Sequence, residues 1–185
     1  MKNYFLLLLC AVSISFVSCN DDPPVIEDLV YAGDNANSPA LPPGIYEFAA
    51  RFPVSFTDDF TGQSLESVEI DLYEIPSILE LRIYGAGSSE APGSMLYSDI
   101  ITGDVVANSR NTVFLSDPIE LTDQELWISV RASQSVEQQV MGCDAGPRDP
   151  NGDRFFANDG SNWTTFNAFS SPESINWNII GRLRE

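Results

Sequence analysis

Two short stretches decide the fold: residues 65–73, Leu-Glu-Ser-Val-Glu-Ile-Asp-Leu-Tyr, and residues 79–84, Leu-Glu-Leu-Arg-Ile-Tyr. In both stretches apolar and polar side chains alternate, and an extended strand sends successive side chains to opposite faces. The pattern therefore predicts two strands with one face on a core and one face in water. The predicted inward set is Val68, Ile70, Leu72, Leu79, Leu81 and Ile83, and the predicted outward set is Glu69, Asp71, Tyr73, Glu80, Arg82 and Tyr84.

Similar short strands are predicted on both sides of these stretches, separated by turns rich in Gly, Pro and Asn. Residues 45–56 contain Pro53, which predicts a sheet edge or a bulge because proline has no N–H to donate. Asn158-Asp159-Gly160 is typical of a hairpin turn. The further predicted strands are residues 29–31, 45–56, 95–101, 111–115, 125–132, 138–141, 154–157, 163–166 and 177–183.

Residues 29–31 and 138–141 are the weaker candidates, so the pattern gives about nine or ten strands, with no amphipathic helix of useful length and no internal repeat. Many short strands between turns are typical of an antiparallel fold with two packed sheets. The sequence therefore predicts an all-β protein, an antiparallel and jelly-roll-like β-sandwich, with a closed barrel as the alternative.

The N-terminal segment is typical of an exported protein. Lys2 is followed by an apolar run from Tyr4 to Val12 and then by small residues. A membrane span needs about 20 apolar residues, so this shorter run indicates a secretory signal peptide. Phe16-Val17-Ser18-Cys19 resembles a bacterial lipobox, in which the cysteine is lipidated and becomes the first mature residue. An ordinary signal peptide cut near Ser18 is the alternative.

The predicted parts are a signal peptide at 1–18, lipidated Cys19 with a polar tether at 19–27, and one β-sandwich domain at 28–185. The lipid on Cys19 makes the membrane a partner, and we expect the protein at the outer membrane or cell surface.

The net charge and the scarcity of histidine and lysine exclude several classes of function. The formal net charge is −18, so the surface repels phosphate backbones and nucleic acid is not expected as a partner. The chain has no histidine, and its single lysine, Lys2, leaves with the signal peptide. Histidine-activated nucleophiles, lysine Schiff bases, P-loops and imidazole zinc sites are therefore excluded, and we expect no enzyme activity. Cys143, the one cysteine of the predicted domain, is expected to be small and partly buried.

Eight segments within residues 28–185 carry a resemblance. They are Phe48-Ala-Ala-Arg-Phe-Pro53, Leu65-Glu-Ser-Val-Glu-Ile70, Leu81-Arg-Ile-Tyr84, Ala91-Pro-Gly-Ser-Met-Leu-Tyr-Ser98, Glu125-Leu-Trp-Ile128, Cys143-Asp-Ala-Gly-Pro147, Asn162-Trp-Thr-Thr165 and Asn176-Trp-Asn-Ile179. In this order they resemble a non-catalytic β-sandwich module of secreted and cell-surface proteins of Bacteroidetes, often found beside peptidase or adhesin domains. The resemblance implies a sandwich fold and a surface location, and it leaves the ligand open.

Two further features bear on this resemblance. Asp21 and Asp22, just after the predicted lipidated cysteine, resemble the surface-export signal of lipoproteins of that phylum. The segment from Arg148 to Asp153 departs from the module, which commonly has a Gly-Lys-Gly-like turn at that place.

Three tryptophans suggest carbohydrate binding, because the C–H faces of sugars stack on flat aromatic rings. Trp163 follows the predicted hairpin turn and is the best candidate for an exposed platform, with Tyr84 and Tyr73 as outward-facing helpers. Trp127 lies opposite the inward set of its strand, so we expect it either in a second packed layer or exposed. Trp177 is expected in the core. For each tryptophan, a structural place in the core or at its rim is the alternative.

Asp144, Asp149, Asn151 and Asp153 form the densest group of oxygen ligands. Asp149-x-Asn151-x-Asp153 has the alternate spacing with which a calcium loop begins, so calcium is the one cofactor that the sequence suggests. The glycine is displaced and the glutamate that would follow is missing, so an EF-hand is excluded, and a solvated turn is the alternative. Asp144 has a second interpretation, in which its carboxylate accepts backbone N–H groups and sets a tight bend with Gly146.

These observations predict a surface-anchored lipoprotein that acts as a non-enzymatic binding or adhesion module for a glycan or a host protein. The alternative is a structural or accessory subunit of a cell-surface assembly with no ligand of its own. A carboxylate-pair glycoside hydrolase is a remote third hypothesis, because acidic residues are abundant and their spacing is not informative without a structure.

Overall fold

The computed structural model describes residues 28–158, 162–170 and 173–184, and this part of the chain consists mainly of antiparallel strands. The strands are β1 (Ala40–Leu41), β2 (Gly44–Phe52), β3 (Ser64–Leu72), β4 (Ile78–Tyr84), β5 (Met95–Ile100), β6 (Ser109–Glu120), β7 (Leu126–Gln134), β8 (Gln138–Gln139), β9 (Arg154–Ala157), β10 (Thr164–Thr165) and β11 (Ile179–Arg184). The short helical segments are α1 (Val54–Thr57), the 3-10 turn η1 (Asp58–Phe60) and α2 (Phe166–Phe169).

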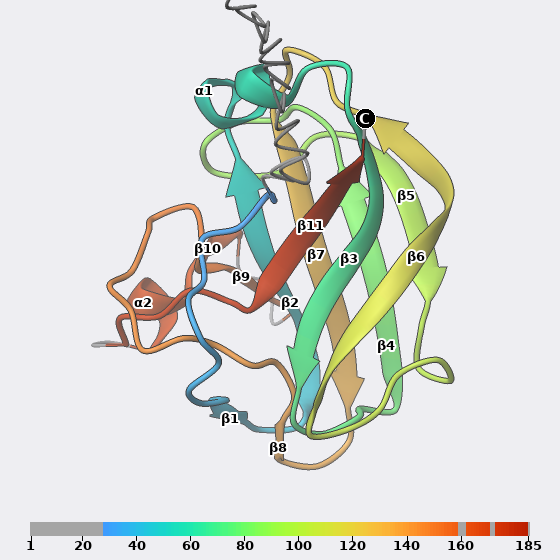
Figure 1. Cartoon of the computed structure of the whole chain (residues 1–185). Coiled ribbons are helices and arrows are strands. Elements are labelled where there is room, and N and C mark those ends of the chain that lie inside the picture. The colour runs from blue at the N-terminus through green and yellow to red at the C-terminus, as the bar shows by residue number, and fades with distance from the viewer. Residues whose placement is uncertain (1–27, 159–161, 171–172, 185) are drawn as a thin grey trace, which may run out of the picture.

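The long strands form two sheets that stack face to face (Figure 1). The large sheet has the order β10-β9-β2-β7-β4-β5, and the small sheet has the order β11-β3-β6. Figure 1 shows the small sheet in front of the central strands of the large one. β1 and β8 form a separate two-residue ladder at one end. The predicted all-β antiparallel sandwich is confirmed, and the described sheets do not join into the alternative, a closed barrel.

The core lies between the two sheets and contains the predicted inward set. All six of those side chains, on β3 and β4, are at most 1% exposed. Across the large sheet, Phe48 on β2 is opposite Val130 on β7, which is opposite Leu81 on β4. Burial of such apolar surface, at about 25 cal/mol per Å², is the main stabilising contribution to a sandwich of this kind.

The predicted strand at residues 45–56 ends earlier than expected, at Phe52. Pro53 cannot donate a ladder hydrogen bond, and its carbonyl accepts the backbone N–H groups of Phe56 (2.8 Å) and Thr57 (3.1 Å). The chain therefore turns into α1 and η1 directly after Pro53. The alternation rule missed this change because Val54 and Phe56 continue the apolar content of the strand.

The strand predicted at residues 111–115 is longer than expected, because β6 runs from Ser109 to Glu120. β6 is an edge strand that pairs only with β3, and its added residues are mainly polar and exposed. Pro118 is tolerated because it lies in the register irregularity between Phe114 and Ile119, where β6 has no paired residue on β3. The predicted strand at residues 29–31 is reduced to one bridge between Leu29 and Gly181. No helix in the described residues has the length and apolar content to cross a membrane.

Candidate ligand-binding site

The outer face of the large sheet, opposite the core, is partly covered by the chain between β4 and β5. This loop, residues 85–94, is closed by backbone hydrogen bonds between Gly85 and Ser94 (2.9 Å) and between Gly93 and Gly85 (3.2 Å). Two hydrogen bonds attach it to the sheet: Gly87 N donates to Glu125 Oε1 (3.3 Å), and Arg154 Nη2 donates to the Glu90 carbonyl (2.9 Å). The loop therefore lies against the sheet near β7 and β9.

Trp127 lies on this outer face and is 0% exposed. Its indole Nε1 donates to Glu125 Oε1 (2.7 Å), and the Arg154 guanidinium lies 5.3 Å from its ring centroid. Arg51 also donates to Glu125, from Nε at 2.9 Å. Burial pushes the pKa of Glu125 up, but the hydrogen bonds from Arg51 and Trp127 outweigh it and hold the pKa below its usual range. Glu125 is therefore a charged acceptor that fixes the tryptophan ring.

A second polar cluster lies beside Trp127 on the same face. Glu47 is 3% exposed, and its Oε1 accepts the Tyr84 hydroxyl (2.7 Å) and the Ser129 hydroxyl (2.6 Å). Arg82 pairs with Glu47 (3.4 Å) and Glu80 (2.7 Å). Burial, together with the Glu47 charge, raises the pKa of Tyr84 to about 12. Tyr84 was predicted to face water, but it is 8% exposed and holds a buried carboxylate, so that prediction was wrong.

Trp163 stands on this buried layer and lines a hollow of about 530 Å³. Its ring meets Trp127 edge-on, with centroids 5.5 Å apart and planes at 70°, and lies 5.6 Å from Phe156 at 35°. The other lining residues are Glu90, Ala91 and Asn162. The hollow thus combines two aromatic side chains with a carboxylate and an amide.

Of the predicted aromatic set, the structure places only Trp163 at this hollow. Trp127 lies underneath it in a second packed layer, which is one of the two expectations for that residue. Trp177 is in the core, as expected, at 1% exposed. Tyr73 lies elsewhere, at the end of the small sheet. Sequence reasoning missed Phe156 and Glu90; Phe156 alternates with buried Phe155 in β9, which was a usable signal.

The Asp144 carboxylate accepts N–H groups at a tight bend, which is the second of the two interpretations of this residue. Its carboxylate accepts N–H groups from Gly33 (3.0 Å), Gly146 (2.9 Å) and Asn176 (backbone 2.7 Å, side chain 2.9 Å). Gly146 has a φ of 78°, the left-handed region expected of a glycine at a tight bend. Cys143, next to Asp144, is 0% exposed, so it is fully rather than partly buried.

The other residues of the calcium hypothesis also bind donors of the protein itself. Asp149 accepts the N–H of Asn151 (2.8 Å), Asn151 accepts Arg51 Nη1 (3.0 Å), and Asp153 pairs with Arg148 (3.0 Å). Within residues 28–158, 162–170 and 173–184, no group of three or more acidic or cysteine side chains is placed to hold a metal ion. Calcium binding at this segment stays a prediction without structural support.

Comparisons with known proteins identify a protein of similar fold and give no information on activity. No protein-family model matches the chain, and no curated protein matches it in sequence. Among solved structures, the clostridial cysteine protease Cwp84 after propeptide cleavage has a similar fold, with a TM-score of 0.60 at 13% identity. The match covers 85% of this chain and 40% of the protease chain. The chain therefore spans less than half of that protein and shares its β-rich architecture.

Proposed function

We propose that this protein is a non-enzymatic glycan-binding module, held at the bacterial surface by a lipid on Cys19. The observation that carries the proposal is the hollow in which Trp163 and Phe156 stand beside Glu90 and Asn162. Aromatic rings stack on the C–H face of a sugar, while carboxylate and amide groups bind its hydroxyls.

The layer beneath the hollow supports this function by holding the rings in place. Trp163 packs on Trp127, which Glu125 and Arg154 fix from two sides. A platform that is ordered before binding loses little conformational entropy when a ligand arrives. The same platform accepts an exposed side chain of a host protein, which is the competing ligand class.

Export and anchoring rest on the sequence. The signal peptide, Cys19 and the tether lie outside the described residues, and their support is the lipobox resemblance and the acidic pair Asp21 and Asp22. Metabolic labelling with an alkynyl fatty acid, compared between the native chain and Cys19→Ser, tests the lipid. Protease treatment of intact cells tests surface exposure at the outer membrane.

A glycan array followed by calorimetry tests the binding function. We expect Trp163→Ala and Phe156→Ala each to weaken binding at least about tenfold, which corresponds to about 1.4 kcal/mol. Phe114→Ala is the matched control, because Phe114 is an aromatic side chain that is 73% exposed on the other sheet. Equal losses in all three variants, or no glycan bound by the native chain, would contradict the proposal. Binding to a host protein that requires Trp163 would replace the glycan by a protein ligand.

One observation favours the second candidate, an accessory subunit of a surface assembly. Among the described strands β5 is an edge of the large sheet, and its apolar residues Met95, Leu96 and Ile100 are 47%, 52% and 64% exposed. An exposed apolar edge strand is a template for pairing with another chain. Stable co-purification with a surface protein, lost on Leu96→Lys and unaffected by Trp163→Ala, would support this role.

A further inference from the structure

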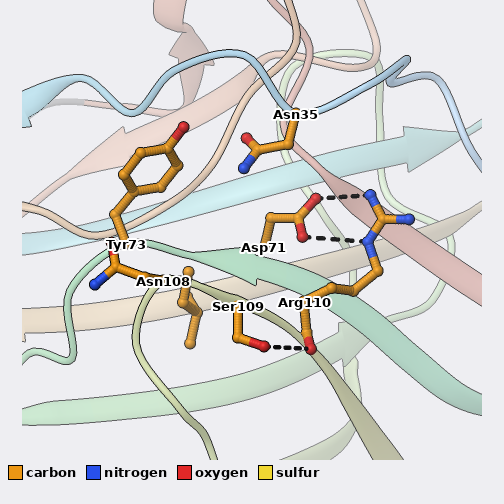
Figure 2. Close-up of a pocket in the computed structure, with 7 residues that line it drawn as sticks. Asn35, Asp71, Tyr73, Asn108, Ser109 and Arg110 are labelled. Carbon is orange, nitrogen blue, oxygen red and sulfur yellow. Dashed lines mark hydrogen bonds and ion pairs between the residues drawn. The ribbon is translucent and has the colours of Figure 1, made fainter.

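A second hollow, of about 300 Å³, lies at the end of the small sheet (Figure 2). Its lining includes Asn35, Asp71, Tyr73, Asn108, Ser109 and Arg110. Asp71 belongs to the outward set of β3, so this hollow opens on the outer side of the small sheet. The Trp163 hollow opens on the outer side of the large sheet. The two hollows therefore lie on opposite faces of the sandwich.

The charged pair of this hollow is rigid and neutral as a unit. Arg110 donates to Asp71 through Nε (3.1 Å) and Nη2 (2.8 Å), and Asp71 is 5% exposed while the Arg110 side chain is 44% exposed. A two-bond fork of this kind fixes both side chains. In the described residues Arg110 Nη1 has no protein partner, so one charge-assisted donor remains for a ligand.

Two further polar side chains of the hollow, Asn35 and Tyr73, are not engaged within the part of the chain that the structure describes. In the view of Figure 2 the Asn35 amide lies between the Tyr73 ring and the Asp71 carboxylate. Neither the Asn35 amide nor the Tyr73 hydroxyl has a hydrogen-bond partner among the described residues. The backbone around them is fixed, since Gly142 N donates to Asp71 O (2.8 Å) and Asn108 N donates to Tyr73 O (3.2 Å).

We propose that this hollow is a second binding site, for a single neutral sugar ring, and that the domain is therefore bivalent. Tyr73 supplies the stacking surface, while the Asn35 amide and Arg110 Nη1 bind hydroxyl groups. A ligand cation would compete with Arg110 for Asp71, and an anion meets a chain of net charge −18, so a neutral ligand fits best. A volume of about 300 Å³ is at the lower end for ligand pockets, which favours one ring over an oligosaccharide.

Bivalency rests on the proposed function, because it requires the Trp163 hollow to bind a glycan as well. Binding at the second hollow can be tested independently of the Trp163 hollow. Sites on opposite faces join two glycan chains, or two places on one long chain, and raise the apparent affinity for a polymer without new contacts. We expect the native protein to cross-link a neutral polysaccharide into larger particles in light scattering. Neither Trp163→Ala nor Tyr73→Ala is expected to do so.

Amide NMR spectra of the isotope-labelled chain test the second hollow directly. The probes are methyl β-glucoside, methyl β-galactoside and methyl α-mannoside, with glucuronic acid and glucosamine as charged counterparts. Each is added to about 50 mM, well above the Kd of about 1 mM expected of one shallow site. We expect a neutral probe to shift the amide signals of residues 71–73 and 108–110. Tyr73→Ala and Asn35→Ala are expected to weaken this binding at least about tenfold, and Trp163→Ala to leave it unchanged.

Asn35 is exposed, so Asn35→Ala keeps the test informative if Tyr73→Ala disturbs the fold. Shifts confined to the surroundings of Trp163 would overturn the second site and leave the proposed function standing. A charged probe that binds this hollow more tightly than every neutral one would overturn the ligand class. Shifts at residues 71–73 and 108–110 without any at Trp163 would support the second hollow and contradict the proposed function.

Discussion

At the scale of single residues, the Asp144 carboxylate joins its own turn to two segments that are distant in sequence. The donors are Gly33, Gly146 and Asn176, and Asp144 is 5% exposed. Burial alone raises the pKa of this carboxyl, but the hydrogen bonds from Asn176, Gly33 and Gly146 together lower it below its usual range. The charged form is therefore the one that the folded protein stabilises.

Replacing Asp144 by asparagine tests this role. The new amide group meets N–H donors and removes the charge that they stabilise, so we expect a loss of about 2–4 kcal/mol in the free energy of unfolding. Urea titration followed by tryptophan fluorescence at neutral pH measures it. Asp149→Asn is the control, because the one hydrogen bond found for that carboxylate closes its own turn and its loss is expected to cost less than about 1 kcal/mol. Equal effects of the two variants would contradict the role of Asp144.

The same carboxylate predicts a pH dependence whose sign follows from its lowered pKa. The unfolded chain takes up the proton at a higher pH than the folded chain does, so the stabilisation is complete above about pH 4. As the pH falls through the lower folded value, the stabilisation disappears. We expect the native chain to lose more stability than Asp144→Asn between about pH 4 and pH 2, measured by urea titration at each pH.

The Cys143 thiol is expected to be unreactive toward alkylating reagents while the protein is folded. Burial, and then the negative charges of Asp144 and Glu173, raise the pKa of its thiol to about 12. At pH 8 almost none of it is the nucleophilic thiolate. Iodoacetamide treatment followed by peptide mass spectrometry should find Cys143 unmodified in the native chain and alkylated in urea. Alkylation at the rate of a free cysteine in the native chain would contradict this.

Residue types alone located part of the candidate site. Trp163 stood out because a tryptophan beside a turn is poorly placed for a core, and it does line a hollow. The burial of Tyr84 and Trp127 could not be predicted from alternation, because it depends on packing against each other and against Trp163, which is distant in sequence. Such contacts between distant segments leave no local signal in the sequence.

At the scale of elements, alternation predicted the strands with one face on the core. β3, β4 and β7 agree with their predicted ranges to within two residues at every end, because side-chain direction has a strict period of two in a strand. It failed where backbone hydrogen bonding decides the outcome, as it does after Pro53. It also failed along β6, whose exposed outer residues from Ser116 to Pro118 carry no apolar pattern.

Turns between elements offer a matched set of glycine substitutions. Gly146 has a φ of 78°, and a Cβ there would lie 2.4 Å from the Ser174 carbonyl oxygen. Gly62 has a φ of 91° with open space around it, while Gly103 has open space and no positive φ. We expect Gly62→Ala to cost about 1 kcal/mol of backbone strain, Gly146→Ala to cost more, and Gly103→Ala to be neutral or slightly stabilising. Urea titration gives the order, and a Gly103 variant as damaging as Gly146→Ala would contradict it.

At the scale of the whole molecule, most arginines are paired with carboxylates of the same domain. Seven arginines form ion pairs with carboxylates on neighbouring strands or loops, and Arg154 lies against Trp127. With a formal net charge of −18, the surface is left with a large excess of carboxylates. The sandwich therefore has an acidic exterior that repels anions and other copies of itself.

This charge excess predicts that salt stabilises the protein. Two like charges about 10 Å apart in water repel by about 0.4 kcal/mol, and a net charge of −18 contains many such pairs. Ion pairs near the surface contribute only about 0–1 kcal/mol each, so their weakening by salt is the smaller effect. We expect Tm to rise by roughly 3–5 °C between about 10 mM and 500 mM NaCl at neutral pH, because the Debye length falls from about 30 Å to a few ångströms. Near pH 4, close to the pI of about 4.1, the net charge is small and the same addition should have almost no effect. A Tm that falls with NaCl at neutral pH would show instead that the arginine–carboxylate pairs, and not the excess charge, dominate the electrostatics of the fold.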